Sequence, residues 1–415
     1  MPAPAVHPPT PPPTYRAVLR APGAPRAFAA SLVGRLSFGT VSLALTVALT
    51  DATGSYAVAG TVLAVFGLSA SLLAPVRAEL VVRRGPRAAL PPLSWACAAL
   101  LGALAFTTWR PAPTPVLLVL TLLAGGCAPP FGAVMRTLWS DLAAGPALRR
   151  RAFSLDTVAE ELLFVAGPLI AGAFVATGSA PAGVAVCALL VLAGGALLAT
   201  APALRTARHG TPRDGTAAPE PAFTVRVLIA PVLVACGIGI ALGALDLLIV
   251  VFAQRAHRPG AVAWPAGALS VGSAVGGVLY GARHWRLGDR ARLSLLALAL
   301  AAALAATGLA PGVWVLVAGA AATGLFVAPA LSTAYLLADD AVPPAARTRA
   351  GTWVSTAFNA GSSAGTALVG LLVEQAPLAL CFALAAAPSA CAALLSSGPA
   401  VRHLVAGRAR WRRLT

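Results

Sequence analysis

Six ionisable residues lie within long apolar stretches of this sequence. They are Arg35, Arg136, Asp156, Glu160, Glu161 and Asp246. An ionisable side chain at membrane depth is costly, so such residues usually mark an ion pair, a proton relay or a substrate site. Asp156 and Glu160 are four residues apart and therefore share one face of a helix. These residue types predict either a group that carries a proton or an ion pair that locks helices together.

Three of the six charges fall at a similar depth. At a helical rise of about 1.5 Å per residue, Arg35, Arg136 and Glu160 each lie roughly 10–14 Å from the same end of their apolar stretches. The stretches that hold them contain three acids and two arginines, so pairing leaves one carboxylate over. A buried carboxylate without a cationic partner holds a proton more readily than one in water.

The composition shows which elements must position these charges. The 415-residue chain is 58% hydrophobic and 10% charged. A soluble globular chain has about 25% charged residues, so the composition excludes a soluble enzyme and a disordered protein. A helix that crosses a membrane needs about 20 predominantly apolar residues. We find twelve such stretches, at 27–49, 57–76, 89–108, 115–139, 153–176, 180–200, 227–252, 262–282, 291–309, 313–337, 351–373 and 377–396.

The basic residues predict the orientation of these helices. All 30 are arginines, and 25 of them fall in the two termini or in every second loop, on one side of the predicted membrane. The opposite side carries only Arg110, Arg255 and Arg258. Loops rich in arginine remain in the cytoplasm, so both termini are predicted to be cytoplasmic. The net charge of +17 is therefore a topology signal, and we expect no binding of nucleic acid.

The chain contains an internal repeat with a shift of 198 residues. The shift superimposes scarce loop residues as well as glycines: Asp141 on Asp339, Pro146 on Pro344, Arg149 on Arg347, Arg151 on Arg349, and Gly167 on Gly365. Two six-helix halves in the same orientation are parallel repeats. With this organisation the chain resembles the major facilitator superfamily of transporters. The resemblance implies twelve helices in two halves that rock about a central substrate site.

One loop resembles a conserved cytoplasmic loop of that family, G-x-x-x-D-R-x-G-R. In Ala78-Glu79-Leu80-Val81-Val82-Arg83-Arg84-Gly85-Pro86-Arg87, two positions match, Arg83 and Gly85. Val82 replaces the acid of the motif, and Arg87 lies one position late. Glu79 is the acid that could take over from the missing one in latching the outward-open state. The alternative is an ordinary turn that carries topology charges.

Two further segments predict close contacts between helices. Gly167-Pro168-Leu169-Ile170-Ala171-Gly172 resembles the core of the antiporter motif of the family. The proline bends a helix, and the glycines let a neighbouring helix approach. The stretch 262–282 carries small residues four apart, at Gly272, Gly276, Gly277 and Gly281. The family fold implies that the two segments face each other as one sliding seam, and simple packing is the alternative.

The resemblance also brings the buried charges together. The fold of the family packs its first, fourth and fifth helices side by side. We therefore expect a cluster that joins Arg35 and Arg136 to Glu160, with Glu161 or Asp156 as a further member. If the cluster couples protons to transport, Glu160→Gln abolishes proton-driven transport and leaves the protein folded. The alternative is a purely structural lock.

The C-terminal half offers few polar groups for a central site. Asp246, on a helix that the family places beside the cavity, is a candidate for binding a proton or a cationic substrate. Alternatively it extends toward Arg255 or Arg258. Asn359 falls on Glu161 under the repeat shift and is a second candidate, and Tyr280 and Tyr335 are weaker ones.

These observations predict five segments. A disordered Pro-rich tail covers 1–26, and the N-terminal six-helix half covers 27–201. A cytoplasmic linker covers 202–226, the C-terminal half covers 227–397, and a basic cytoplasmic tail covers 398–415.

The sequence predicts a transporter and not an enzyme. A phosphate-binding G-x-x-x-x-G-K-[ST] loop needs lysine, which the chain lacks, and Cys and His show no metal-ligand spacing. We expect no metal and no cofactor, with the proton gradient as the energy source.

The chain resembles actinobacterial drug and metabolite exporters of the superfamily. We predict a monomeric, multi-pass transporter of the inner (plasma) membrane that exports small amphipathic compounds in exchange for protons. The alternatives are a facilitator or importer of a small metabolite, and a non-transporting scaffold or sensor.

Overall fold

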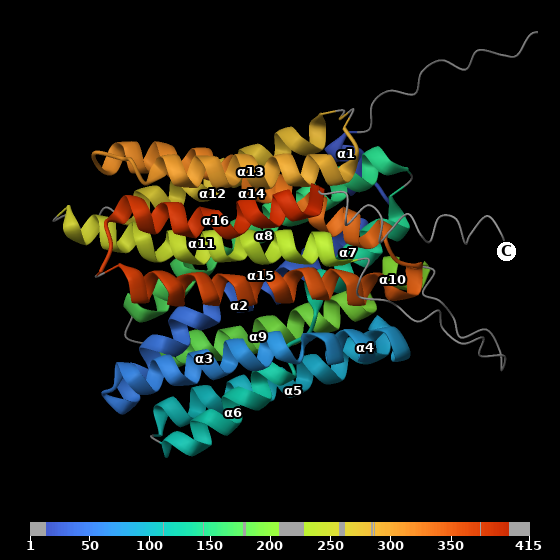
Figure 1. The fold of residues 1–415 in the computed structure, drawn as a ribbon. Coiled ribbons are helices and arrows are strands. Elements are labelled where there is room, and N and C mark those ends of the chain that lie inside the picture. Colours follow the sequence, from blue (N-terminus) through green and yellow to red (C-terminus); the bar gives the residue numbers. More distant parts are fainter. Residues whose placement is uncertain are drawn as a thin grey trace, which may run out of the picture.

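The protein folds as a bundle of long helices that run alongside one another (Figure 1). The structure, a computed structural model, describes residues 14–110, 112–143, 145–176, 180–206, 228–256, 262–283, 285, 287–373 and 375–397. These residues form helices, turns and short connections, and no strand occurs among them. The all-helical fold that the sequence predicts is confirmed.

The N-terminal half comprises ten helices, two of them short, within the described residues. They are α1 (Tyr15–Leu19), α2 (Ala24–Thr53), α3 (Tyr56–Leu72), α4 (Ala74–Arg84), α5 (Pro86–Trp109), α6 (Thr114–Gly126), α7 (Phe131–Leu142), α8 (Pro146–Ala176), α9 (Ala180–Thr200) and α10 (Ala203–Thr206). The C-terminal half comprises α11 (Ile229–Arg255), α12 (Ala263–Ala282), α13 (Asp289–Thr307), α14 (Val313–Asp340), a 3₁₀ turn (Pro344–Ala346), α15 (Arg347–Leu372) and α16 (Leu378–Ser397).

The twelve predicted membrane stretches all fall on these helices. Among the described residues, eight helical segments are long and apolar enough to cross a membrane, and the bent pair of α3 and α4 makes a ninth. α8, α12 and α15 are 31, 20 and 26 residues long but fall outside that group. α8 and α15 carry charged or hydroxyl side chains on the surfaces where the two halves meet.

Prolines divide two of the predicted stretches. The bend of 43° between α3 and α4 precedes Pro75, and the break between α6 and α7 contains Pro129 and Pro130. Proline lacks the N–H of a helical hydrogen bond, so each break leaves carbonyls without a helical partner. Arg77 is buried and donates to them, from Nη1 to the Gly125 carbonyl at 2.8 Å and from Nη2 to the Ala70 carbonyl at 2.5 Å. Arg77 is one of the 25 arginines that the sequence assigns to termini and loops, and the structure corrects this by placing it in α4.

The described part of the N-terminal tail is helical rather than disordered. Thr14 caps α1, its hydroxyl accepting from the amide of Ala17 at 3.3 Å. α2 starts at Ala24, three residues before the predicted boundary, after Gly23 turns the chain with a φ of +75°. The rest of the tail (1–13), most of the linker (207–227) and the C-terminal tail (398–415) lie outside the described residues.

Small residues let helices of the same half approach closely. A Cβ at Gly167 of α8 would overlap the backbone of Gly39 in α2, and a Cβ at Gly276 of α12 would overlap the carbonyl of Leu325 in α14. Gly272 meets α14 in the same way. Gly167 therefore lies inside the N-terminal half, and not at the seam between halves where we expected it. Pro168 and Gly172 also belong to α8.

The packing of α12 on α14 predicts a measurable loss of stability. Gly276→Ala places a methyl group against the Leu325 backbone, which cannot move aside, and we expect about 1–3 kcal/mol of destabilisation. Gly267→Ala in the same helix is the matched control, because nothing lies within 4 Å of its added Cβ. Unfolding of the purified variants in detergent measures both effects. Equal stability of the two variants would contradict the packing interpretation.

Candidate transport site and gate

Four of the six ionisable residues in the apolar stretches form one ion-pair cluster inside the N-terminal half. Arg35 of α2 contacts Asp156 and Glu160 of α8, with Nη–O distances of 2.8 Å in both cases. Nη1 of Arg136 of α7 contacts the same two carboxylates at 3.1 Å each. Asp156 is fully buried, and both arginines are about 6% exposed. We call these four residues the charge cluster.

The charge cluster is balanced and follows from local structure. Asp156 and Glu160, one helical turn apart, present their carboxylates to the same neighbours, and α2, α7 and α8 pack on one another. Two positive and two negative groups cancel, which limits the cost of burying them. Asp156, rather than Glu161, is the second acid of the cluster.

Glu161 stands apart from the charge cluster although it is next in sequence to Glu160. One residue corresponds to a rotation of about 100° around a helix, so the two side chains leave α8 in different directions. Glu161 has no hydrogen bond or ion pair with any described residue. It lies within electrostatic range of Asp246 on α11, across the boundary between the halves. The unpaired acid of the site is therefore Glu161.

Asp246 is exposed, although most of its neighbours along α11 are buried. It forms no ion pair with Arg255, whose Nη2 donates to the carbonyl of Val373 at 2.6 Å. Arg258 lies outside the described residues. Asp246 and Glu161 are thus two carboxylates, one in each half, that form no ion pair with a described residue. No group of three or more His, Cys, Asp or Glu in the described chain is placed to hold a metal ion.

The other predicted polar candidates lie in different surroundings. Asn359 of α15 is exposed. Tyr280 is buried within the C-terminal half, where its hydroxyl accepts from Thr333 at 2.8 Å and its ring faces Arg292 at 5.4 Å. It does not line a site between the halves. Tyr335 of α14 is also buried, but its ring lies against Arg136 of the charge cluster, with 3.8 Å from the guanidinium carbon to the ring centroid.

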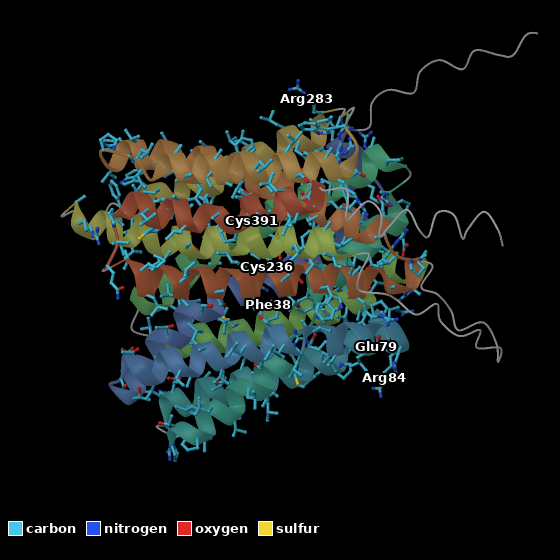
Figure 2. All side chains as sticks on the ribbon, in the orientation of Figure 1. Phe38, Glu79, Arg84, Cys236, Arg283 and Cys391 are labelled. Carbon is cyan, nitrogen blue, oxygen red and sulfur yellow. The ribbon has the colours of Figure 1, made fainter. Side chains whose placement is uncertain are left out.

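Contacts between the two halves concentrate at one end of the bundle. We call it the basic end. It is the right-hand end in Figures 1 and 2, where α1, α4 and α10 lie and where Figure 2 labels Glu79 and Arg84. There, Arg149 of α8 lies 3.6 Å from Asp339 and also contacts Asp340. Arg347 of α15 lies 3.6 Å from Asp141 of α7.

These ion pairs follow the internal repeat. Asp141 and Asp339 are repeat partners, and so are Arg149 and Arg347. Each half thus contributes an aspartate that pairs with the arginine of the other half. Thr137 and Thr348 share a hydrogen bond of 2.9 Å between the same helices. We call this set of contacts the reciprocal latch.

The loop that resembles the family motif adds a further contact between halves. Oε2 of Glu79 lies 3.2 Å from Nε of Arg349 in α15, and Oε1 of Glu79 accepts from Arg83 at 2.7 Å. Gly85 joins α4 to α5 with a φ of +77°, which favours glycine. Arg87 donates to the carbonyl of Ala199 at 3.4 Å, inside its own half. Val82 occupies the position of the acid in the family motif. In this chain Glu79 therefore provides the acid of this loop.

The seam of α8 and α12 closes the space between the reciprocal latch and the charge cluster. Ser154 donates to the Gly277 carbonyl, and Ser332 of α14 donates to Thr157 at 3.1 Å. A Cβ at Gly277 would strike Val158, and one at Gly281 would strike the hydroxyl of Tyr15. Two of the four predicted glycines of α12 thus face α8, whereas the other two face α14.

The N-terminal helix α1 crosses the same seam. The Tyr15 hydroxyl donates to the Val278 carbonyl of α12 at 2.6 Å and lies 3.5 Å from Ser154 of α8. Burial raises the pKa of this hydroxyl, so it stays protonated as a donor. The hydrogen bonds and ion pairs described above between the halves lie at the basic end and along this seam. These contacts hold the halves together at the basic end.

The reciprocal latch predicts how one substitution changes the conformational balance. Arg347→Gln removes its ion pairs with Asp141 and Asp339, each worth about 0.2–1 kcal/mol at this exposure. We expect a several-fold faster reaction of a cysteine placed at Thr157 with an impermeant maleimide added from the basic end. Arg84→Gln is the matched control, since Arg84 is exposed and forms no ion pair with a described residue. Equal labelling rates in both variants would contradict the latch.

Comparisons with known proteins agree with this architecture. The model of the Major Facilitator Superfamily matches residues 27–282 and 233–408. No curated protein matches the sequence significantly. The fold is similar to that of the human organic anion transporter MFSD10, with a TM-score of 0.71 and 16% identity over 93% of this chain and 100% of that one.

Two further solved structures share the fold. A bacterial homologue of the iron transporter ferroportin in an outward-facing state has a TM-score of 0.70 and 15% identity over 90% of this chain and 97% of that one. The E. coli fucose:proton symporter FucP has a TM-score of 0.63 and 16% identity over 90% of this chain and 98% of that one. At these identities the likeness shows the fold alone.

Proposed function

Because the chain belongs to the major facilitator superfamily and is a membrane transporter rather than an enzyme, we propose that it exchanges protons for small amphipathic compounds by alternating access. The observation that carries the proposal is that two acids, Glu161 on α8 of one half and Asp246 on α11 of the other, form no ion pair with a described residue. The proton gradient supplies the energy, and no cofactor takes part. Export by a protein like the actinobacterial drug exporters fits this chemistry.

The two acids have distinct parts in the proposed cycle. With the basic end closed, Glu161 takes a proton from the opposite side, which removes the repulsion between its carboxylate and that of Asp246. The halves then close at that side and separate at the basic end, where the proton leaves. The carboxylate of Asp246 now attracts a compound that carries a positive charge. Return of the loaded protein delivers the compound to the opposite side.

The charge cluster has a supporting part in this cycle. Glu160, the acid that the sequence favours for coupling, contacts both arginines, so its negative charge is compensated inside the N-terminal half. If Glu160 lost its negative charge by taking up a proton, the two arginines would be left with one carboxylate. In the proposed cycle Glu161 therefore carries the proton, and Glu160 has a structural role.

The orientation completes the proposal. We place the basic end in the cytoplasm, since 25 of the 30 arginines belong to that side, and the protein in the inner (plasma) membrane as a monomer. The conformation closed at the basic end is then the outward-facing one. Glu79 contacts Arg349 across the boundary between the halves. This contact favours a gate that opens and closes over a non-transporting scaffold.

Proton release tests the proposal directly. Addition of a permanently charged, amphipathic quaternary ammonium compound to the detergent-solubilised protein should release protons into a weakly buffered solution. A facilitator would bind the compound without release, and a scaffold would do neither. If the compound saturated its binding site and no protons were released, the proposal of proton exchange would be rejected.

A further inference from the structure

We infer that Tyr335 is a positioning residue that couples the charge cluster of the N-terminal half to closure of the basic end. The inference rests on the proposed transport function but concerns a different group from Glu161 and Asp246. Its basis is a contact between halves: the ring of Tyr335, on α14, faces the guanidinium of Arg136, on α7, at 3.8 Å.

The contact is buried on both sides. Tyr335 is 5% exposed and Arg136 is 5% exposed, so water does not screen the attraction between the cation and the ring face. Gly132, one turn before Arg136, provides the space for the guanidinium, because a Cβ there would lie 3.0 Å from Nη2. The guanidinium thus has its carboxylate partners within its own half and an aromatic ring from the other half.

This arrangement links two events. When the halves separate at the basic end, α14 moves away from α7, and Arg136 exchanges the ring for water. Closure therefore stabilises the buried, fully paired form of the charge cluster, and a fully paired charge cluster stabilises closure, because coupling between two sites is reciprocal. Tyr335 is a side chain of the C-terminal half that contacts the charge cluster directly.

The chemistry of the contact separates coupling from simple packing. Tyr335→Phe keeps the ring face and loses only the hydroxyl. Tyr335→Leu keeps an apolar side chain and loses the ring face. A packing role predicts similar behaviour of the two variants, whereas a cation–π contact predicts that phenylalanine restores what leucine loses.

The distance between the two halves at the basic end provides the readout. Arg84 and Arg283 are exposed and lie on different halves, at opposite edges of this end (Figure 2). Cysteines at these two positions, in a chain whose six native cysteines are replaced by alanine, carry spin labels for distance measurements in lipid nanodiscs. Transport is not needed for this readout.

We expect Tyr335→Leu to raise the population with the longer label distance about tenfold over the parent, and Tyr335→Phe to stay within about twofold of it. If the leucine variant does not fold, Tyr335→Met takes its place, since methionine fills irregular space without a ring.

Three results would overturn the inference. Unchanged distances in the leucine variant, or equal shifts in both variants, would show that the ring face is not coupled to closure; proton release by the parent would then still support the transport function. A parent with one fixed distance at all pH values and with added quaternary ammonium compound would reject alternating access itself, and the coupling with it.

Discussion

Replacing Asp156 by alanine is expected to lower the free energy of unfolding by about 3–5 kcal/mol. Asp156 is fully buried and contacts both arginines of the charge cluster, at 2.8 Å and 3.1 Å. Its removal leaves two buried positive charges with one carboxylate, Glu160, which is 31% exposed. An uncompensated buried charge is far more costly than the loss of a surface ion pair. Thermal and chemical unfolding in detergent measures the change.

Two variants control this prediction. Asp51→Ala removes an exposed acid of the same helix bundle, and we expect its stability to stay within about 0.5 kcal/mol of the parent. The double variant Arg35→Leu with Asp156→Leu removes one charge of each sign and leaves Arg136 paired with Glu160. Because well-packed apolar residues often replace a buried ion pair without loss, the double variant should recover most of the stability. A double variant less stable than Asp156→Ala would contradict this account of the charge cluster.

The charge cluster also shows how far sequence reasoning reaches. Depth along a helix follows from counting residues, so the sequence could place Arg35, Arg136 and Glu160 at one level. Direction around a helix follows only from knowing which neighbour lies on which side. The sequence alone therefore could not decide between Asp156 and Glu161 as the second acid. The structure decides because α2 and α7 both lie against the face of α8 that carries Asp156.

The internal repeat also relates the ion pairs that join the two halves. The shift of 198 residues pairs Asp141 with Asp339 and Arg149 with Arg347. Parallel repeats are related by a pseudo-two-fold axis along the membrane normal. If one aspartate reaches the arginine of the other half, the axis makes the second pair follow. Once the two halves are recognised, the sequence is therefore sufficient to predict the reciprocal latch.

Other features could not be predicted because they depend on which helix is the neighbour. Gly167 has the same local sequence whether it faces α12 or α2, and only the packing shows that it meets Gly39. Arg77 looks like a loop charge until the break between α6 and α7 provides carbonyls for it. The sequence offers Tyr335 as a weak candidate for the central site, and only the packing of the two halves shows that its ring faces Arg136.

The largest functional effect is expected from the neighbouring glutamates of α8. In vesicles whose interior is one pH unit more acidic than the outside, exchange for one proton drives about tenfold accumulation of a quaternary ammonium compound, because one unit is worth 1.36 kcal/mol. Glu161→Gln should reduce accumulation to the passive level while downhill exchange of the compound continues. The reason is that glutamine cannot carry the proton but keeps the size and polarity of the side chain.

Glu160→Gln is the matched comparison, one residue away on the same helix. Glu160 has two arginine partners and Glu161 has none among the described residues, so the two variants separate structure from coupling. We expect Glu160→Gln to lose stability and whatever folded protein remains to keep uphill transport. Glu161→Gln should unfold like the parent and lose uphill transport. The reverse outcome would return the proton-carrying role to the charge cluster.

Asp246→Asn distinguishes the proton from its exchange partner. If Asp246 provides the negative charge that holds a cationic compound, its loss weakens binding and therefore downhill as well as uphill transport, whereas Glu161→Gln affects only the uphill component. Uncharged amphipathic compounds provide the internal control, because they lack the charge that Asp246 would attract and should be transported equally by the parent and Asp246→Asn. If Asp246→Asn reduced the transport of charged and uncharged compounds equally, Asp246 would not be part of the substrate site. Glu161 would then be the single functional acid between the halves.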